Sequence, residues 1–421
     1  MKTKYILRAL IIVFMIRLFF ALFPSFQVDM GTWLAWAKRM AELGPSHFYS
    51  DTVWTQYTPG FLYWLWIIGK LGLVNPLAIK IPTILADMLV GYLIWKIIRK
   101  TDISFANFAF IFYVLSPVAI LNGSIWGQID GILTLFMFLS VFVLLEMKRN
   151  YLSWIFASMA FLIKPQAIAI YPLLGIVSLI RFGWKKTIFS ILIGGAVIII
   201  GFIPFYPHDT IVGIVNLIQK MGQSYSYTSL FAFNIWSYVG MWKLDSTNFA
   251  GLSYFTWGVI LSFGAYVAML WRYRKVQSNN VIIYLMFALS CYIFFLFPTR
   301  AHERYLFPMF AYLVTFTGMI KQRIIFFLTG LAVVIYTINL YLSYSYYETV
   351  LNPFKNVFWE QSITNMIPVL SAIQIGIFGC LILSPIRENL KEKMPVLRRH
   401  RKTVEQWRDK YPGEKAEEEE K

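Results

Sequence analysis

The sequence predicts an all-α polytopic membrane protein, on the strength of its composition, its apolar runs and the charges of its loops. Of the 421 residues, 58% are hydrophobic and only 14% are charged, well below the quarter that is usual for soluble domains. Aromatic residues reach 18%, as expected where Trp and Tyr line both membrane interfaces. The two cysteines, Cys291 and Cys380, fall in apolar runs, which argues against a disulfide framework.

Long apolar runs predict about twelve transmembrane helices. The runs cover residues 5–25, 77–98, 104–121, 129–147, 151–163, 165–181, 187–206, 252–271, 280–297, 303–320, 323–345 and 366–385. The first run has a basic flank but no small-residue cleavage site after it, so we expect an uncleaved first helix.

The basic residues predict the orientation. With the N-terminus in the cytoplasm, the basic loops all lie inside, as the positive-inside rule requires. The basic residues are spread among short loops. We therefore interpret the net charge of +17 as a determinant of membrane topology and not as a sign of nucleic-acid binding. The long aromatic loops 26–76, 207–251 and 346–365 are then predicted outside.

Two segments of the first outer loop are predicted to be amphipathic helices at the membrane interface. Making 58–73 a transmembrane span would invert every later loop, so we place it on the outer face. Residues 30–43 are similar, with Trp33, Ala37 and Met40 on one face and charged residues on the other. We expect residues 1–385 to form a transmembrane catalytic domain and 386–421 a charged cytoplasmic tail.

The densest group of ionisable residues lies between two apolar runs, in Phe297 to Pro308. It contains Arg300, His302, Glu303 and Arg304. Charges at the edge of the bilayer are costly and are commonly kept for a function. Two arginines and a histidine suit an anion, and phosphate is the natural candidate. The alternative is structural, with Arg300 or Arg304 paired to Glu303 or Asp29.

A carboxylate just beyond the first span is a candidate general base. Asp29 precedes the predicted interfacial segment, where it could point into a cleft between this loop and the bundle. An equally simple interpretation is that Asp29 caps a helix.

Other polar residues near the predicted outer face also have two interpretations. Gln128 and Asp130 offer partners for sugar hydroxyls, although such residues are common in turns. Lys164 violates the positive-inside trend, so it either extends to the interface or pairs with an anion. Asp87 lies within a span and needs a partner, for which Arg17 is available.

Motifs of soluble enzymes are absent from the sequence. It has no Walker A sequence, no Gly-x-Gly-x-x-Gly, no zinc-type His/Cys spacing and no Gly-x-Ser-x-Gly elbow. We expect no cofactor and no metal-ligand set, with a carboxylate-bound divalent ion left open.

Taken in order, the motifs resemble those of the GT-C superfamily of polytopic glycosyltransferases, and most of all the prokaryotic relatives of the GPI mannosyltransferases. The resemblance extends to about residue 385 and rests on Asp29-Met30-Gly31-Thr32-Trp33, Tyr57-Thr58-Pro59-Gly60-Phe61-Leu62-Tyr63, Lys80-Ile81-Pro82 with Asp87, Trp126-Gly127-Gln128-Ile129-Asp130, Lys164-Pro165-Gln166 and Arg300-Ala301-His302-Glu303-Arg304-Tyr305. One departure is Tyr57-Thr58-Pro59, where the family usually has Tyr-Pro-Pro.

The resemblance implies an inverting transferase that moves a sugar, typically mannose, from a polyprenyl-phosphate donor to an acceptor hydroxyl at the outer membrane face. It implies that Asp29 is the base. The donor phosphate would bind Arg300, His302, Arg304 and Lys164, and the sugar or acceptor would contact Gln128, Asp130, Tyr57, Gln166 and Glu303. The expected partners are the lipid-linked donor, a glycan, lipid or protein acceptor, and membrane lipids, in the plasma membrane of a prokaryote.

Three other functions remain open. A glycan polymerase or ligase also uses polyprenyl-linked donors. A flippase for lipid-linked sugars should carry charges along a path through the membrane, where this chain has only Arg17 and Asp87. A non-catalytic subunit of an envelope assembly would need neither Asp29 nor the basic cluster.

Overall fold

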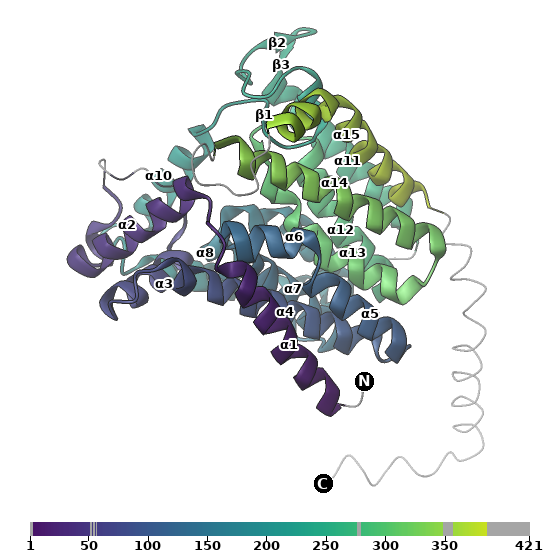
Figure 1. The fold of residues 1–421 in the computed structure, drawn as a ribbon, viewed down its shortest axis with the longest axis horizontal. Helices are drawn as coiled ribbons and strands as arrows, with labels where there is room; N and C mark the ends of the chain where they lie inside the picture. Colours follow the sequence, from purple (N-terminus) through teal and green to yellow (C-terminus); the bar gives the residue numbers. More distant parts are fainter. Residues whose placement is uncertain are drawn as a thin grey trace. The chain divides into compact units, whose positions relative to one another are not determined.

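The computed structural model describes residues 3–50, 53, 55, 57–275, 279–347 and 357–384. The chain is mainly helical (Figure 1) and divides into two units, Met1–Gly379 and Cys380–Lys421. The predicted tail, 386–421, lies outside the described residues, so the domain boundary at residue 385 remains a prediction.

Helices make up the first half of the chain. In order they are α1 (Thr3–Ala21), α2 (Gln27–Leu43), η1 (Pro45–His47), α3 (Pro59–Lys70), α4 (Pro76–Ile98), α5 (Ile103–Val114), α6 (Pro117–Ala119), the π-helix η2 (Ile120–Trp126), α7 (Asp130–Glu146), α8 (Asn150–Ile163), η3 (Pro165–Ile170) and α9 (Tyr171–Phe202). Side-chain caps fix three of these starts, since Asn75 accepts a hydrogen bond from the backbone of α4, Asp102 from that of α5 and Ser116 from that of α6.

Short strands interrupt the helices of the second half. The elements are α10 (Thr210–Gln223), β1 (Ser229–Leu230), η4 (Ile235–Tyr238), β2 (Asn248–Phe249), β3 (Leu252–Ser253), α11 (Tyr254–Tyr273), α12 (Asn280–Leu296), β4 (Ala301–His302), η5 (Glu303–Leu306), α13 (Phe307–Ile320), α14 (Arg323–Tyr347) and α15 (Val357–Leu383). β1 pairs in parallel with β4, so that Leu230 lies opposite His302, and β2 pairs antiparallel with β3.

Six helical segments among the described residues are long and apolar enough to cross a membrane: Pro76–Ile98, Ile103–Trp126, Pro165–Phe202, Tyr254–Tyr273, Arg323–Tyr346 and Gln361–Leu383. Each of the predicted apolar runs overlaps at least one helix. α9 contains two of these runs because Gly183, with φ of 77°, breaks the helix between them. The all-α membrane fold is therefore confirmed, while the number of twelve spans stays a prediction.

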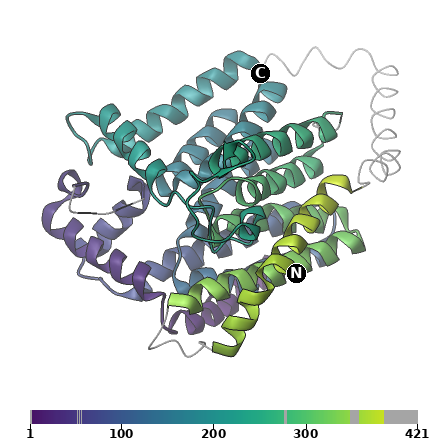
Figure 2. The same cartoon turned by 90° about the horizontal axis from the view of Figure 1, so that it is seen from above.

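The first outer loop forms two helices that pack together at one side of the bundle, and both views show α2 and α3 side by side there (Figures 1 and 2). Trp33, Ala37 and Met40 are buried, as the periodicity of 30–43 predicts. A Cβ at Gly60 would meet the Leu162 carbonyl oxygen at 2.5 Å, so α3 begins directly against the end of α8. The structure thus forms the two helices, and their location at the membrane interface remains a prediction.

A buried ion pair joins α1 to α4. Arg17 Nη2 lies 2.8 Å from Asp87 Oδ2, and both side chains are fully buried. The same guanidinium donates to Ser124 Oγ and to the carbonyl oxygens of Val114 and Ala119. Arg17 is therefore the partner of Asp87, and the pair holds α1, α4 and η2 together just before the segment that carries Gln128.

Candidate active site

Asp29 lies in the first turn of α2, but it does not cap the helix. The N-cap position belongs to Phe26, and no side chain caps that end. Asp29 Oδ2 instead accepts hydrogen bonds from Trp126 Nε1 at 2.9 Å and from Gln128 Nε2 at 2.5 Å. Both donors bond the same oxygen, and no described residue donates a hydrogen bond to Oδ1. The carboxylate is thus held by the end of η2 and has one oxygen available.

Lys164 contacts the side chain of Gln128. Its Nζ is 2.7 Å from Asp130 Oδ1 and 3.2 Å from Gln128 Oε1. It also lies 5.4 Å from the centre of the Tyr57 ring. The side chains of Lys164 and Asp130 are only 4% and 3% exposed. Lys164 therefore pairs with an anion, the second of the two alternatives, and that anion is the carboxylate at the start of α7, where the helix dipole favours negative charge.

The first cavity is the space in front of Asp29, with a volume of about 200 Å³. It is lined by Phe26, Val28, Asp29, Trp126, Tyr225, Phe231, Trp242, His302, Glu303, Arg304 and Ser343. Asp29 and Arg304 thus line one space although 275 positions separate them in the sequence. This cavity is not lined by Gln128, Asp130, Lys164 or Tyr57. They form a second group of contacts, in which Gln128 bonds Asp29 and Lys164 contacts Asp130 and the Tyr57 ring.

Arg304 and His302 share Glu303 as a neighbour. Arg304 Nη1 is 2.9 Å from Glu303 Oε1, and His302 Nδ1 is 3.9 Å from Glu303 Oε2. Arg304 Nε and His302 Nε2 are buried and have no hydrogen-bond partner in the described part of the chain. Burial, reinforced by the charges of Arg304 and Lys164, lowers the pKa of His302 well below its usual range. The histidine is therefore neutral at neutral pH and keeps an unused ring nitrogen.

Arg300 forms a separate ion pair. Its Nε lies 2.6 Å from Asp245 Oδ2 and its Nη2 3.2 Å from Asp245 Oδ1, and its Nη1 donates to the Gly222 carbonyl. The Asp245 side chain is 1% exposed, whereas that of Arg300 is 29% exposed. Both arginines of the cluster are thus ion-paired, as the structural alternative proposed, but the partner of Arg300 is Asp245, not Glu303 or Asp29.

The second cavity adjoins the first and has a volume of about 300 Å³. Its lining is Phe161, Pro165, Gln166, Ile168, Ile218, Met221, Gly222, Ser224, Tyr225, Phe294, Arg300, His302 and Tyr305. Tyr225 and His302 line both cavities. Gln166, whose side chain bonds Tyr305, therefore belongs to the second cavity, away from Asp29. The rest of this lining is largely apolar, and the two shared residues, Tyr225 and His302, carry polar groups.

Sequence reasoning predicted 207–251 as an aromatic outer loop but missed that three of its residues line the first cavity. Tyr225, Phe231 and Trp242 line it with φ values of 55°, 63° and 58°, a region that non-glycine residues seldom adopt. Such strain concentrates at functional sites. The sequence does not indicate a positive φ at these positions, because glycine, the residue that usually signals one, is absent from them. Trp126 and Asp245 were also missed, although Trp126 is part of a quoted motif.

In the part of the chain that the structure describes, no three His, Cys, Asp or Glu side chains form a group that could hold a metal ion. Independence from cofactors remains a prediction.

Residues 56–208 match the model of the dolichyl-phosphate-mannose-protein mannosyltransferase family. The matched segment contains Tyr57, Gln128, Asp130, Lys164 and Gln166, whereas Asp29 and the 300–304 cluster lie outside it. No curated protein matches the chain. The family match supports a GT-C membrane glycosyltransferase, which confirms the resemblance seen in the motifs.

Proposed function

We propose that this protein transfers a sugar, in the first instance mannose, from a polyprenyl-phosphate donor to an acceptor hydroxyl, with inversion at the anomeric carbon. The observation that carries the proposal is that Asp29 and Arg304 line the same cavity from opposite parts of the chain. A carboxylate can take a proton on one side of a bound sugar while a guanidinium stabilises a phosphate on the other.

Asp29 acts as the general base in this proposal. An acceptor hydroxyl is a poor nucleophile until a positioned group takes its proton as the new bond forms. Trp126 and Gln128 both donate to Oδ2, so that Oδ1 is the oxygen available to the hydroxyl. Two donors on one oxygen also fix the orientation of the carboxylate before the substrate arrives.

Lys164 and Gln128 take a different role from the one first expected. Both were predicted to contact substrate, yet they lie behind Asp29 and bond to each other. We assign them to positioning. Lys164 donates to the amide oxygen of Gln128, which leaves the amide nitrogen facing Asp29, and Asp130 holds Lys164 in place.

The donor phosphate is proposed to lie at the wall between the two cavities, near His302. Arg304 Nε and His302 Nε2 have no partner among the described residues. Arg304 Nε can donate to a phosphate oxygen, and His302 Nε2 can do so in the tautomer that carries the proton on that nitrogen. The apolar lining of the second cavity, which includes Ile168, Ile218 and Phe294, suits the first prenyl units. Arg300 lines that cavity too and would add positive charge from within its pair with Asp245.

The chemistry needs one base and no general acid. The acceptor oxygen forms a bond to the anomeric carbon, its proton passes to Asp29, and the bond from that carbon to the phosphate oxygen breaks. Polyprenyl phosphate leaves as a stable anion. Because attack and departure occur on opposite faces of the sugar ring, the anomeric configuration inverts.

A flippase is less well supported by the structure. The two charged residues deep in the predicted spans, Arg17 and Asp87, are fully buried and bonded to each other, so they do not form a path for a charged headgroup. A glycan polymerase or ligase remains a competitor, because it would need the same base and cations.

The decisive experiment incubates the purified protein in lipid with polyprenyl-phosphate mannose, glucose or arabinose and a panel of acceptors. We expect consumption of one monosaccharide donor and a product with a single added sugar of inverted configuration. Repeated addition, or use of oligosaccharide donors alone, would favour the polymerase or ligase. Movement of the lipid across the membrane without bond cleavage would favour the flippase.

A further inference from the structure

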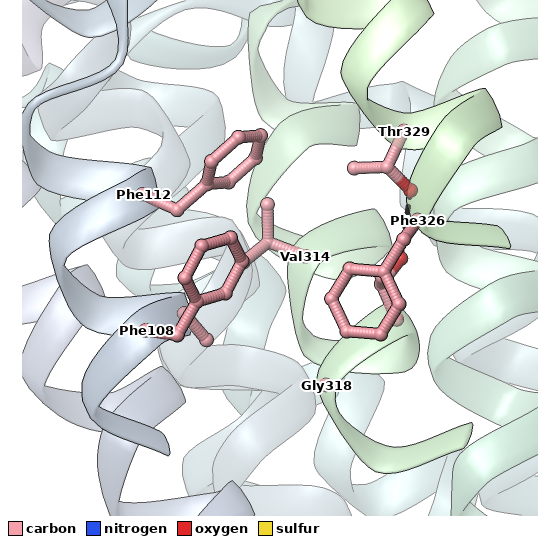
Figure 3. A pocket seen from close by; sticks show the side chains of 8 residues that line it. Phe108, Phe112, Val314, Gly318, Phe326 and Thr329 are labelled. Carbon is pink, nitrogen blue, oxygen red and sulfur yellow. Dashed lines mark hydrogen bonds between the residues drawn. The ribbon is translucent and has the colours of Figure 1, made fainter. Parts of the chain in front are cut away.

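A third cavity lies between α5, α13 and α14. Figure 3 shows Phe108 and Phe112 on one side of it and Phe326 and Thr329 on the other. Its volume is about 170 Å³, and its lining is Phe108, Ala109, Phe112, Val314, Thr317, Gly318, Phe326 and Thr329. The hydroxyl oxygens of Thr317 and Thr329 lie 2.8 Å apart, and each also lies within hydrogen-bond distance of a carbonyl oxygen of its own helix. With these groups satisfied, the cavity presents an apolar interior.

A wider hollow of about 550 Å³ continues the cavity outward. The two spaces share Phe108 and Phe326, and the outer one adds Ser104, Phe105, Lys321 and Arg323. Phe108 is 53% exposed, so the crevice opens at the surface of the bundle. We call the two spaces together the crevice. Its inner part, the third cavity, is an apolar slot between helices, and its outer part is a mouth that contains the two basic residues Lys321 and Arg323.

The two basic residues at the mouth differ in how they are held. Lys321 Nζ is 2.8 Å from Asp102 Oδ2 and 5.0 Å from the centre of the Phe105 ring. Asp102 therefore offsets the charge of Lys321. Arg323 begins α14, is exposed, and has no ion-pair partner in the described part of the chain. The net charge at the mouth is positive, and Arg323 is the group free to meet an anion.

The position of this crevice separates it from the proposed active site. Phe326 lines the crevice and Ser343 lines the first cavity, and both lie on α14. Seventeen residues of helix extend about 25 Å at roughly 1.5 Å per residue, close to the thickness of the hydrocarbon core. The crevice and the proposed active site thus lie near opposite faces of the membrane. The crevice mouth is on the face with the basic loops, which the sequence predicts to be cytoplasmic.

We infer that this crevice binds an anionic glycerophospholipid of the inner leaflet, with an acyl chain in the apolar slot and the phosphate at Arg323. Both parts of the ligand have a complement. Phenylalanine rings and aliphatic groups line the slot, and basic pockets between membrane helices on the cytoplasmic side suit anionic headgroups. The inference depends on the membrane orientation and not on the proposed reaction.

The test measures lipid binding to the purified full-length protein by native mass spectrometry, with phosphatidylglycerol and phosphatidylcholine of identical acyl chains. We expect the wild type to bind phosphatidylglycerol more tightly. Arg323→Gln should weaken phosphatidylglycerol binding about fivefold, the contribution of one basic residue near an anionic headgroup, and leave phosphatidylcholine unchanged. Arg149→Gln is the matched control, because Arg149 is an exposed arginine in another predicted cytoplasmic loop that lines neither part of the crevice.

A second variant tests the apolar slot. Ala109→Leu adds bulk to its lining and should weaken the binding of both lipids, while glycerol phosphate without acyl chains should not compete at equal concentration. Arg323 is exposed, so its variant reports on binding even if Ala109→Leu does not fold. Equal binding of the two lipids by the wild type, or the same affinity in Arg323→Gln and Arg149→Gln, would overturn the inference.

Discussion

The side-chain amide of Gln128 donates a hydrogen bond of 2.5 Å to the carboxylate of Asp29. This contact joins the first outer loop to the segment between η2 and α7, across 99 positions of sequence. It helps to hold Asp29, which lines the first cavity, in an orientation in which one oxygen accepts two hydrogen bonds and the other accepts none from the described residues. That geometry is why Asp29, among the carboxylates of this region, is the proposed base.

Replacing Asp29 with asparagine should abolish most turnover without unfolding the protein. The amide oxygen of asparagine can still accept from Trp126 and Gln128, so the local structure persists, but the side chain can no longer take a proton. We expect a loss of roughly a hundredfold or more in kcat, typical of a general base, with donor binding retained. Asp209→Asn is the control, since that exposed residue lies outside both cavities. Near-normal turnover in Asp29→Asn would transfer the assignment to Glu303.

Lys164 should prove important for stability through Asp130. Lys164→Met leaves a carboxylate that is 3% exposed without its partner, which typically costs about 3–5 kcal/mol. Replacing both residues, in Lys164→Met with Asp130→Leu, should recover much of that loss, as measured by thermal unfolding in detergent in a double-mutant cycle. The double variant should still transfer poorly, because Gln128 no longer has the donor that orients it. A Lys164→Met variant of normal stability and weaker donor binding would instead restore the original phosphate-binding role.

How far the sequence predicts this site depends on whether contacts are local. Asp29 could be found because it follows a recognisable span, and Arg17 because a buried Asp87 requires a cation. The packing of Lys164 against Asp130 and Gln128 could not be foreseen, because it depends on how the start of α7 and the end of α8 pack together. The Arg300–Asp245 pair depends on an irregular loop. Because that loop has no periodicity, the sequence could not predict which carboxylate Arg300 contacts.

The two arginines of the cluster should respond differently to substitution. Arg300→Ala leaves Asp245 buried and unpaired, so we expect a clear loss of thermal stability with a smaller effect on donor binding. Arg304→Lys keeps the charge beside Glu303 but loses the planar fork that suits phosphate, so donor affinity should fall while stability stays near the wild-type value. Binding of a polyprenyl-phosphate sugar and melting temperature, measured on both variants, separate the two roles. Unchanged donor affinity in Arg304→Lys would place the phosphate elsewhere.

His302 should make the protein less stable in mild acid. Its folded-state pKa is lowered by burial and by Arg304 and Lys164, whereas in the unfolded chain it lies near 6.5. The unfolded state therefore binds the extra proton first. The neutral imidazole therefore contributes to the free energy of unfolding fully above about pH 6.5. This contribution is lost as the pH falls from there toward the folded-state pKa. Thermal unfolding between pH 7.5 and 5 should show a downward trend that is weaker in His302→Asn. Equal slopes in the two proteins would mean that His302 is already charged in the folded state.

The orientation of the chain gives the last prediction, because it decides on which face the reaction occurs. Cysteines introduced at Ser50 and Ser224 should react with an impermeant thiol reagent in intact cells, since both lie in loops predicted outside. One introduced at Lys275, in a basic loop after α11, should react only after the membrane is permeabilised. Native Cys380 is exposed and could itself react with the reagent, so it must be replaced before the other cysteines are introduced. Labelling at position 275 in intact cells would reverse the topology. It would then place Asp29 on the cytoplasmic face and the basic crevice on the outer one.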